Sequence, residues 1–198
     1  MTGIKTHRGA NFGHALANRE RQRADRHRSQ TFAAHGKPIG KNHAVRVTAK
    51  VDYAVRAAVV LARAARTGTE PVKGRRIREE QEIPLRFCEN ILGELRQEGI
   101  VRSQRGAEGG YWLARPADEI TIAEVIRAVE GPLANVRGER PEVIEYPDGS
   151  GSLQQVWVAT RAALRSVLEE VTLADVASGR LPVSVASLLE DPDAWEPH

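Results

Sequence analysis

Apolar residues recur at three-to-four spacing from residue 48 to about residue 66, which is the period of an amphipathic helix that Thr48 can cap. A shorter helix over 73–81 is anchored by Ile77, and the tight turn 82–84 separates it from a third helix that ends near Gly99. The third helix carries an apolar face made of Phe87, Cys88, Ile91, Leu92 and Leu95. Helix, tight turn and helix in this order form the helix-turn-helix layout.

Two short β-like stretches follow over about 100–114, on either side of a glycine-rich loop. Gly106, Gly109 and Gly110 allow a sharp tip and a close backbone approach. Arg105 stands at this tip, where an arginine suits insertion into a narrow, electronegative minor groove. Glycine loops also cradle nucleotide phosphates, but "RGAEGG" matches no Walker pattern and precedes a strand instead of opening a helix.

The second half of the chain predicts three helices. Thr121 and Glu124 form a capping box for a helix that ends at Gly131, and the loop 132–151 follows. A second capping box, Ser152 with Gln155, opens a long helix that is expected to bury Val156, Trp157, Thr160, Leu164, Val167, Leu168 and Val171. This stripe is long for the end of a monomer, so a partner helix is expected. A short helix from Thr172 to about Gly179 then leads to a tail over 183–198 that is predicted to be flexible.

We therefore predict a mainly α fold, with a winged helix-turn-helix domain over 45–131 and a two-stranded wing. Within it, the helix-turn-helix lies at about 74–97 and the wing at about 100–114. A long C-terminal dimerisation helix and the short terminal helix occupy 152–182.

Residues 1–44 do not resemble a domain, because they are highly charged and show almost no apolar periodicity. They form either a disordered basic arm that touches DNA phosphates or the product of a wrongly chosen start codon, since the patterned sequence begins at Val45 and a valine codon can serve as a bacterial start. The second interpretation is favoured. Five histidines in this segment are scattered without the spacing of metal ligands.

Charge is segregated along the chain. Formal charges of +7 over 1–44, +5 over 45–116 and −9 over 117–198 make up the net charge of +3. A basic front half suits a polyanionic partner such as nucleic acid. No apolar run is long enough to span a membrane, no secretory signal is evident, and a single cysteine, Cys88, excludes an intrachain disulfide framework. We expect a cytoplasmic protein, and no His, Asp, Glu or Cys constellation points to an enzyme.

Four segments carry a resemblance to a known family: "RVTAKVDYAV", "IPLRFCENILGELRQEGIVRSQRGAEGGYWLARP", "EITIAEVIRAVEGPL" and "LEEVTLADV". The stretch 45–182 resembles the Rrf-type family of winged helix-turn-helix transcriptional regulators, which includes IscR-, NsrR- and CymR-like proteins. The wing pattern Arg-Gly-x-x-Gly-Gly-Tyr followed by Leu-Ala-Arg-Pro is the specific part of the match. The resemblance implies a homodimeric repressor or activator whose long helix, here Ser152 to Glu170, supplies the dimer interface.

The resemblance also implies which residues meet DNA: Lys50, Tyr53, Arg86, Glu89, Asn90, Ser103, Gln104, Arg105 and Gly106. Lys50, Tyr53 and Ser103 suit contacts to phosphates, which position the protein without reading sequence. On the recognition helix, Arg86 can pair bidentately with guanine and Asn90 with adenine. The alternative for Arg86 and Glu89 is an ordinary solvated helix face.

Departures from the family concern its cofactor. Many members hold an iron–sulfur cluster through cysteines in the loop that corresponds to 132–151, and this loop has none. Gln154 stands where a ligand histidine is found in IscR-like members. We therefore expect no iron–sulfur cluster, no metal site and no other cofactor. Glu82 stands where the family's turn often has glycine.

Cys88 has two interpretations. It is either a small hydrophobe of the core, which we favour, or a redox switch on the DNA-reading helix, although its neighbours supply no clear field that would stabilise a thiolate.

Together these features predict a homodimeric, sequence-specific DNA-binding transcriptional regulator, a repressor controlled by a small-molecule, redox or protein signal. Its DNA partner would be an approximate palindrome. The alternative is a winged-helix module used for protein contact without a role on DNA.

Overall fold

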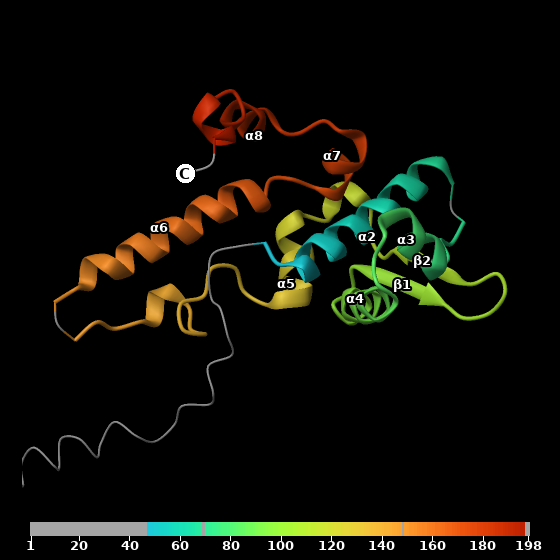
Figure 1. Ribbon diagram of the computed structural model, residues 1–198, viewed down its shortest axis with the longest axis horizontal. Helices are drawn as coiled ribbons and strands as arrows, with labels where there is room; N and C mark the ends of the chain where they lie inside the picture. Colours follow the sequence, from blue (N-terminus) through green and yellow to red (C-terminus); the bar gives the residue numbers. More distant parts are fainter. Residues whose placement is uncertain (1–46, 69, 148, 197–198) are drawn as a thin grey trace, which may run out of the picture. The chain divides into compact units, whose positions relative to one another are not determined.

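The computed structural model describes residues 47–68, 70–147 and 149–196, all of which belong to the compact unit 43–198. The two interpretations of residues 1–44 lie outside the described residues. The elements, labelled in Figure 1, are α2 (Ala49–Thr67), α3 (Gly74–Gln81), α4 (Leu85–Gln97), β1 (Val101–Gln104), β2 (Gly110–Leu113), the 3-10 turn η1 (Ala117–Glu119), α5 (Ile122–Glu130), η2 (Pro141–Val143), α6 (Gly151–Leu168), α7 (Leu173–Ser178), α8 (Val183–Leu188) and η3 (Pro192–Trp195).

Helix α2 is the centre of the hydrophobic core. Its N-cap is Thr48, whose hydroxyl accepts a hydrogen bond from the Val51 amide at 3.2 Å, as the sequence predicts. Helices α3, α4, α5 and α7 and strand β2 all pack against α2. Its buried side chains are Val51, Ala54, Ala57, Ala58, Val59, Val60, Leu61 and Ala62. The two helices of the helix-turn-helix and the second wing strand therefore all pack against the same helix.

The turn between α3 and α4 closes as a helix-turn-helix. Glu82 ends α3 in the left-handed conformation, with φ 51° and ψ 35°, although a side chain normally disfavours this region. The next amide, that of Ile83, donates to the Arg78 carbonyl at 3.0 Å, and the Ile83 side chain is buried. From α2, Arg56 donates to the side-chain and backbone oxygens of Gln81. These contacts fix the angle at which α4 leaves the turn.

The wing is an antiparallel pair of strands whose register joins Val101 to Leu113 and Gln104 to Gly110. Before α3, the Val72 backbone pairs with Tyr111 in both directions, at 3.0 Å and 2.9 Å, and so ties the wing to the helix-turn-helix. The two-stranded wing of the sequence prediction is confirmed.

The tip of the wing requires glycine at position 109. A Cβ atom there would lie 2.2 Å from the Gln104 carbonyl oxygen, a distance that real Cβ atoms do not reach. We expect Gly109→Ala to lower the free energy of unfolding by about 1–3 kcal/mol, because the hairpin must open to admit the methyl group. Denaturant unfolding followed by circular dichroism measures this change.

Gly93 provides the matched control. It lies inside α4, and no atom comes within 4 Å of a Cβ built there. Gly93→Ala should raise stability by about 0.5–1 kcal/mol, because alanine is the better helix former. Equal stability of the Gly109 variant and the wild type would show that the tip relaxes without cost.

After α6 the chain returns to the winged-helix core. The Ile122 amide donates to the Val171 carbonyl at 2.9 Å, and the Leu173 amide donates to the Ile120 carbonyl at 2.9 Å. The expected capping box at Thr121–Glu124 is present, a further one at Thr172–Asp175 opens α7, and both helices end at the expected glycines. Helix α7, grouped with the dimerisation helix in the sequence analysis, therefore packs in the same core as α2.

The segment 183–198, predicted as a flexible tail, is not without regular structure, because its described part forms α8 and η3. Val185 is buried in the core, and the Ser184 hydroxyl donates to the Glu170 carboxylate. The Trp195 indole donates to the Leu189 carbonyl at 2.9 Å, which closes the last turn. The short apolar run around Val185 has enough contacts to order the segment.

Helix α6 differs from the expectation in two respects. The helix begins at Gly151 with Ser150 as its N-cap, so the proposed capping box of Ser152 and Gln155 does not start it. The neighbouring side chain of Gln154 instead donates to the Glu142 carbonyl at 3.0 Å. The apolar stripe is buried only in part within one chain: Val171, just after α6, is buried, Val167 and Leu168 pack against the core, and Val156 is exposed.

Candidate nucleic-acid interface

The outer face of α4 presents three polar side chains without partners among the described residues. Arg86, Glu89 and Asn90 are exposed, and no hydrogen bond or ion pair engages their side chains in the described part of the chain. Cys88 and Ile91, on the opposite face, are buried against α2 and α3. The inner face of α4 is therefore held in the core, and the hydrogen-bond donors and acceptors of its outer face are available to an external partner.

The charged side chains of helix α3, which precedes α4 in the helix-turn-helix, are arranged differently. Arg75 pairs with Glu79 at 2.8 Å, and Arg76 pairs with Glu80 at 2.5 Å, each across one helical turn. Such pairs largely neutralise the surface of α3. Of the two helices, α4 is the one whose outer polar side chains have no partners among the described residues.

Phe87 lies on the outside, contrary to the expectation that it joins the core. Its side chain is 46% exposed, and its ring meets that of Tyr53 edge-on, with centroids 5.8 Å apart. The buried positions of α4 follow an i, i+3, i+4, i+7 pattern that starts at Cys88, and position 87 is rotated about 100° from that face. The pair of rings adds an apolar patch beside Arg86 that suits a thymine methyl group or a sugar.

Lys50, which is expected at a DNA phosphate, also has partners within the chain. Its ammonium donates to the Val129 carbonyl at 2.6 Å and forms an ion pair with Glu94 at 2.8 Å. These bonds join α2 to the end of α5 and to α4. Lys50 thus links the recognition helix to α2 and α5, and both Lys50 and Tyr53 remain partly exposed.

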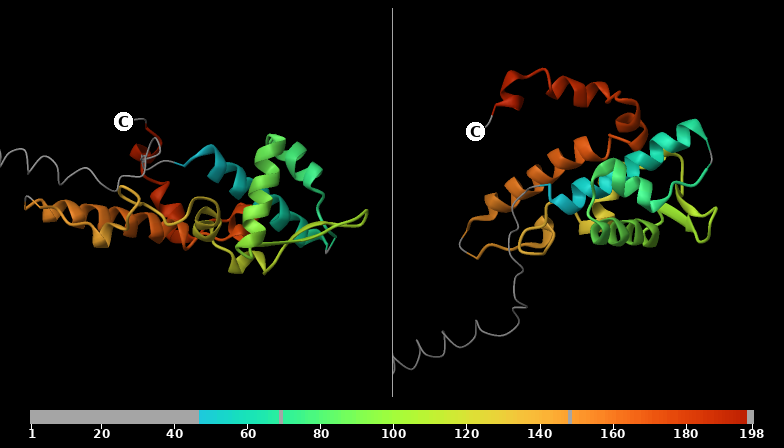
Figure 2. Two further views of the ribbon diagram at one scale, coloured as in Figure 1. Left: turned by 90° about the horizontal axis from the view of Figure 1, so that it is seen from below. Right: turned by 45° about the vertical axis from the view of Figure 1, so that its right-hand side comes forward.

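The wing carries the second group of predicted residues. Ser103, Gln104 and Arg105 are exposed, and Gly106 adopts φ +107°, which permits the turn directly after the arginine. Arg105 has no ion-pair partner among the described residues, whereas Ser103 accepts a long contact of 3.4 Å from Arg96. The hairpin projects beyond the helices in the views of Figures 1 and 2. An unpaired guanidinium therefore stands at the end of a projecting hairpin.

Sequence reasoning missed the residue that supports this tip. Lys73, just before α3, donates to the backbone carbonyls of Ala107 and of Gly109, the latter at 2.6 Å. Lys73 is more than thirty residues away from these two carbonyls in sequence, so no local sequence pattern predicts the contact. Lys73 holds the inner side of the loop and leaves Arg105 as the outward cation.

Cys88 is a buried thiol. Its side chain is 3% exposed, and its sulfur faces the Gly74 carbonyl at 3.9 Å. Burial raises the pKa of the Cys88 thiol, and the nearby Arg78 charge offsets this only in part. Because the thiolate is the reactive form, the structure supports the interpretation of Cys88 as a core residue.

We expect Cys88 to react with a thiol reagent at pH 8 at least about tenfold more slowly in the folded protein than in guanidinium chloride. Peroxide should leave DNA affinity unchanged in both the wild type and Cys88→Ser. If peroxide abolished DNA binding by the wild type and not by the serine variant, Cys88 would be a redox switch.

None of the described helices is long and apolar enough to cross a membrane.

A family model described as an iron-dependent transcriptional regulator, Rrf2, matches residues 47–179. A helix-turn-helix-type transcriptional regulator of Mycobacterium tuberculosis is 51% identical over 152 residues, which cover 77% of this chain and 93% of the relative. CymR of Bacillus subtilis is 32% identical over 134 residues, which cover 68% of this chain and 91% of CymR.

Solved structures agree with these matches. The structure of CymR, the global cysteine regulator of B. subtilis, superposes with a TM-score of 0.58 at 30% identity and covers 68% of this chain and 98% of CymR. The IscR structure from T. potens gives a TM-score of 0.53 at 28% identity, over 77% of this chain and 93% of IscR. With the helix-turn-helix and wing in place and the family model matched from α2 to the end of α7, the chain belongs to the Rrf2 family of winged-helix, DNA-binding transcriptional regulators and is not an enzyme.

Proposed function

We propose that this protein is a homodimeric repressor that binds an approximately palindromic operator and releases it in response to a signal. The observation that carries the proposal is the contrast between α3 and α4. Acid–base pairs neutralise α3, whereas Arg86, Glu89 and Asn90 on α4 have no partners among the described residues and stand next to a wing with an unpaired Arg105.

On DNA, α4 would enter the major groove and the wing the flanking minor groove. Arg86 would donate two hydrogen bonds to guanine, Asn90 would bind adenine bidentately, and Glu89 would accept from a cytosine amine. Ser103 and Gln104 would bind the phosphates beside the minor groove, with Tyr53 at the phosphates beside α4. The Arg105 guanidinium would lie in the narrow minor groove, where the negative potential is strongest.

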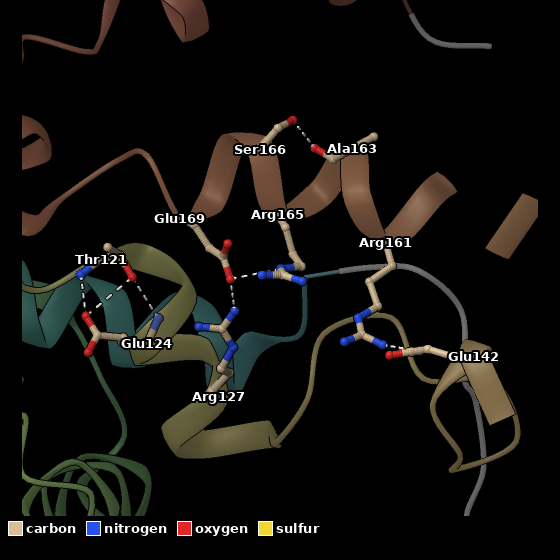
Figure 3. Close-up of polar contacts among 9 residues, drawn as sticks. All are labelled: Thr121, Glu124, Arg127, Glu142, Arg161, Ala163, Arg165, Ser166 and Glu169. Atoms are coloured by element: carbon tan, nitrogen blue, oxygen red, sulfur yellow. Dashed lines mark hydrogen bonds and ion pairs between the residues drawn. The ribbon is translucent and has the colours of Figure 1, made fainter. Parts of the chain in front are cut away.

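The dimer would form through α6. Figure 3 shows that Glu169, the C-cap of α6, joins both Arg165 of α6 and Arg127 of α5, and that Arg161 of α6 pairs with Glu142 of η2. These ion pairs hold one side of α6 to its own chain.

The other side of α6 is open. Ala163 and Ser166 lie away from α5 in Figure 3, and both are exposed. Val156, seven residues before Ala163 and therefore on the same side of the helix, is an exposed apolar residue. An 18-residue helix with no buried residue gains stability from a partner helix, and a second copy supplies an equally apolar one.

We propose that the protein works without an iron–sulfur cluster. In the loop between α5 and α6, the side chains around the hollow beside η2 include Glu142, Glu145, Tyr146 and Gln154, which offer oxygen and amide atoms and no thiolate. Among the described residues no three His, Cys, Asp or Glu side chains come together as a metal site, and the one cysteine is buried in the winged-helix core. Since clusters of this class are held by thiolates, these residues do not fit one. The signal would instead be a small molecule, a redox change or a protein partner.

Fluorescence anisotropy tests the proposed function. The purified protein is titrated onto duplex DNA from upstream of its own gene and onto a shuffled duplex at the same salt concentration. We expect the first duplex to bind at least about a thousandfold more tightly. Equal, salt-sensitive binding to both would mean that only charge is read, and no binding at low salt would favour a winged-helix protein-interaction module.

A further inference from the structure

The segment after α7, residues 181–196, is called here the C-terminal arm. It contains α8 and η3 and lies beyond the residues 47–179 that the family model matches. The arm exposes large apolar side chains: Leu181, Val183, Leu188, Leu189 and Trp195. Val183 is 86% exposed and Trp195 is 70% exposed. A concentration of apolar side chains this large on one short segment indicates a contact surface.

These side chains are held on ordered backbone. Val185 is buried in the core, Ser184 bonds the Glu170 carboxylate, and Asp191 caps η3 by accepting from the Asp193 amide at 3.0 Å. The entropy of ordering the arm is therefore already offset within one chain, so docking a partner on it costs little further ordering.

The charge of the arm excludes DNA as its partner. Residues 181–196 contain no lysine or arginine and carry acidic side chains at Glu190, Asp191, Asp193 and Glu196. A polyanion is repelled by such a segment, whereas an apolar protein surface is not.

The position of the arm indicates which protein surface it meets. In Figure 1 and in the right-hand view of Figure 2, the chain turns back after α7 and the arm runs along α6, on the side opposite α5 and η2. This is the side of α6 that the ion pairs to α5 and η2 leave open. The open side of α6 and the arm thus lie on the same side of this chain, where the α6 of a second copy would reach both.

We propose that the C-terminal arm of each chain closes over the α6 helix of a second copy, so that this helix packs between the α6 and the arm of the first chain. This inference rests on the proposed α6 dimer and adds a second contact to it. Both apolar faces are then covered by one occupant, and the acidic side chains stay at the solvent edge.

Cross-linking between two differently tagged chains tests the arrangement, in a Cys88→Ser background that lacks the native thiol. One chain carries Leu188→Cys in the arm, and the other carries Val156→Cys or, separately, Ala163→Cys in α6. We expect a bifunctional maleimide to give a product that contains both tags. The alternative is tested with Leu188→Cys and Val156→Cys in one chain, mixed with excess cysteine-free chain.

The outcomes separate the arm from the dimer. Cross-linking within one chain, or none at either α6 position in a sample that sedimentation shows to be dimeric, overturns the arm proposal and leaves the proposed regulator intact. A monomeric wild type in sedimentation overturns both the arm and the dimer, and DNA affinity is measured separately by anisotropy.

Dimer affinity provides an independent measurement. Val183→Ser together with Leu188→Ser should raise the dimer dissociation constant by at least about tenfold, because two apolar contacts are lost while the fold of the single chain is unaffected. Val47→Ser is the matched control, because Val47 is also highly exposed, at 73%, but precedes α2. A dissociation constant that changes equally in the control and the arm variant would overturn the proposal.

Discussion

Val156→Asp is expected to convert the protein into a monomer and to weaken binding to a two-half-site operator by at least about a hundredfold. In one chain this side chain is 53% exposed, so a carboxylate costs the folded monomer little. In the α6 dimer the same carboxylate would be buried twice without a cation, which costs several kcal/mol for each ion. Loss of the dimer also removes the effective concentration that links the two half-sites.

Sedimentation and operator anisotropy measure the two effects on the same sample. Val156→Ile is the control, because it keeps an apolar side chain of similar shape and should preserve both the dimer and operator affinity. A Val156→Asp protein that remains dimeric would show that α6 does not form the interface. A monomeric variant with full operator affinity would show that one winged helix suffices.

Arg105→Ala is expected to reduce operator affinity by about 1–3 kcal/mol, which is roughly 5- to 150-fold. At the wing tip the Arg105 guanidinium has no partner among the described residues. The loop itself is held by the hydrogen bonds from Lys73 to the carbonyls of Ala107 and Gly109. Removing Arg105 therefore deletes a contact to DNA without unfolding the hairpin. Melting temperature should stay at the wild-type value.

The control for Arg105 is a loss of charge elsewhere on the domain. Arg63 is exposed on α2, so Arg63→Ala removes one positive charge without touching the wing or α4. If both variants weaken binding equally and in the same salt-dependent way, Arg105 contributes only general electrostatics. Unchanged affinity in Arg105→Ala would remove the wing from the mechanism.

The features that could be predicted from the sequence depend on neighbours in the chain. Thr121 with Glu124, Thr172 with Asp175 and the glycine stop at Gly179 are satisfied within one helical turn, so their geometry follows from spacing. Wing register is set in the same way by a short hairpin.

The features that could not be predicted depend on distant contacts. Lys50 meets Val129 and Glu94, and Lys73 meets the wing loop, because the tertiary fold brings together segments far apart in sequence. Phe87 was assigned to the core because an aromatic residue beside an apolar face is ambiguous until the packing partner, here Tyr53, is known. The C-terminal arm is ordered because Val185 packs in the same hydrophobic core as α2, which is a contact between distant segments.

The backbone bonds between Ile122 and Val171 and between Leu173 and Ile120 bring the two ends of one long excursion together. Within the segment that these bonds enclose, α5 packs on α2, and the Arg127–Glu169 ion pair joins the last turn of α5 to the end of α6. The loop, η2 and α6 therefore leave the end of α5 and return beside it. The loop, η2 and α6 can therefore lengthen, shorten or change their side chains without changing the frame that holds α4. In a chain arranged in this way, the part that responds to a signal can change while the frame that positions the DNA-reading helix stays the same.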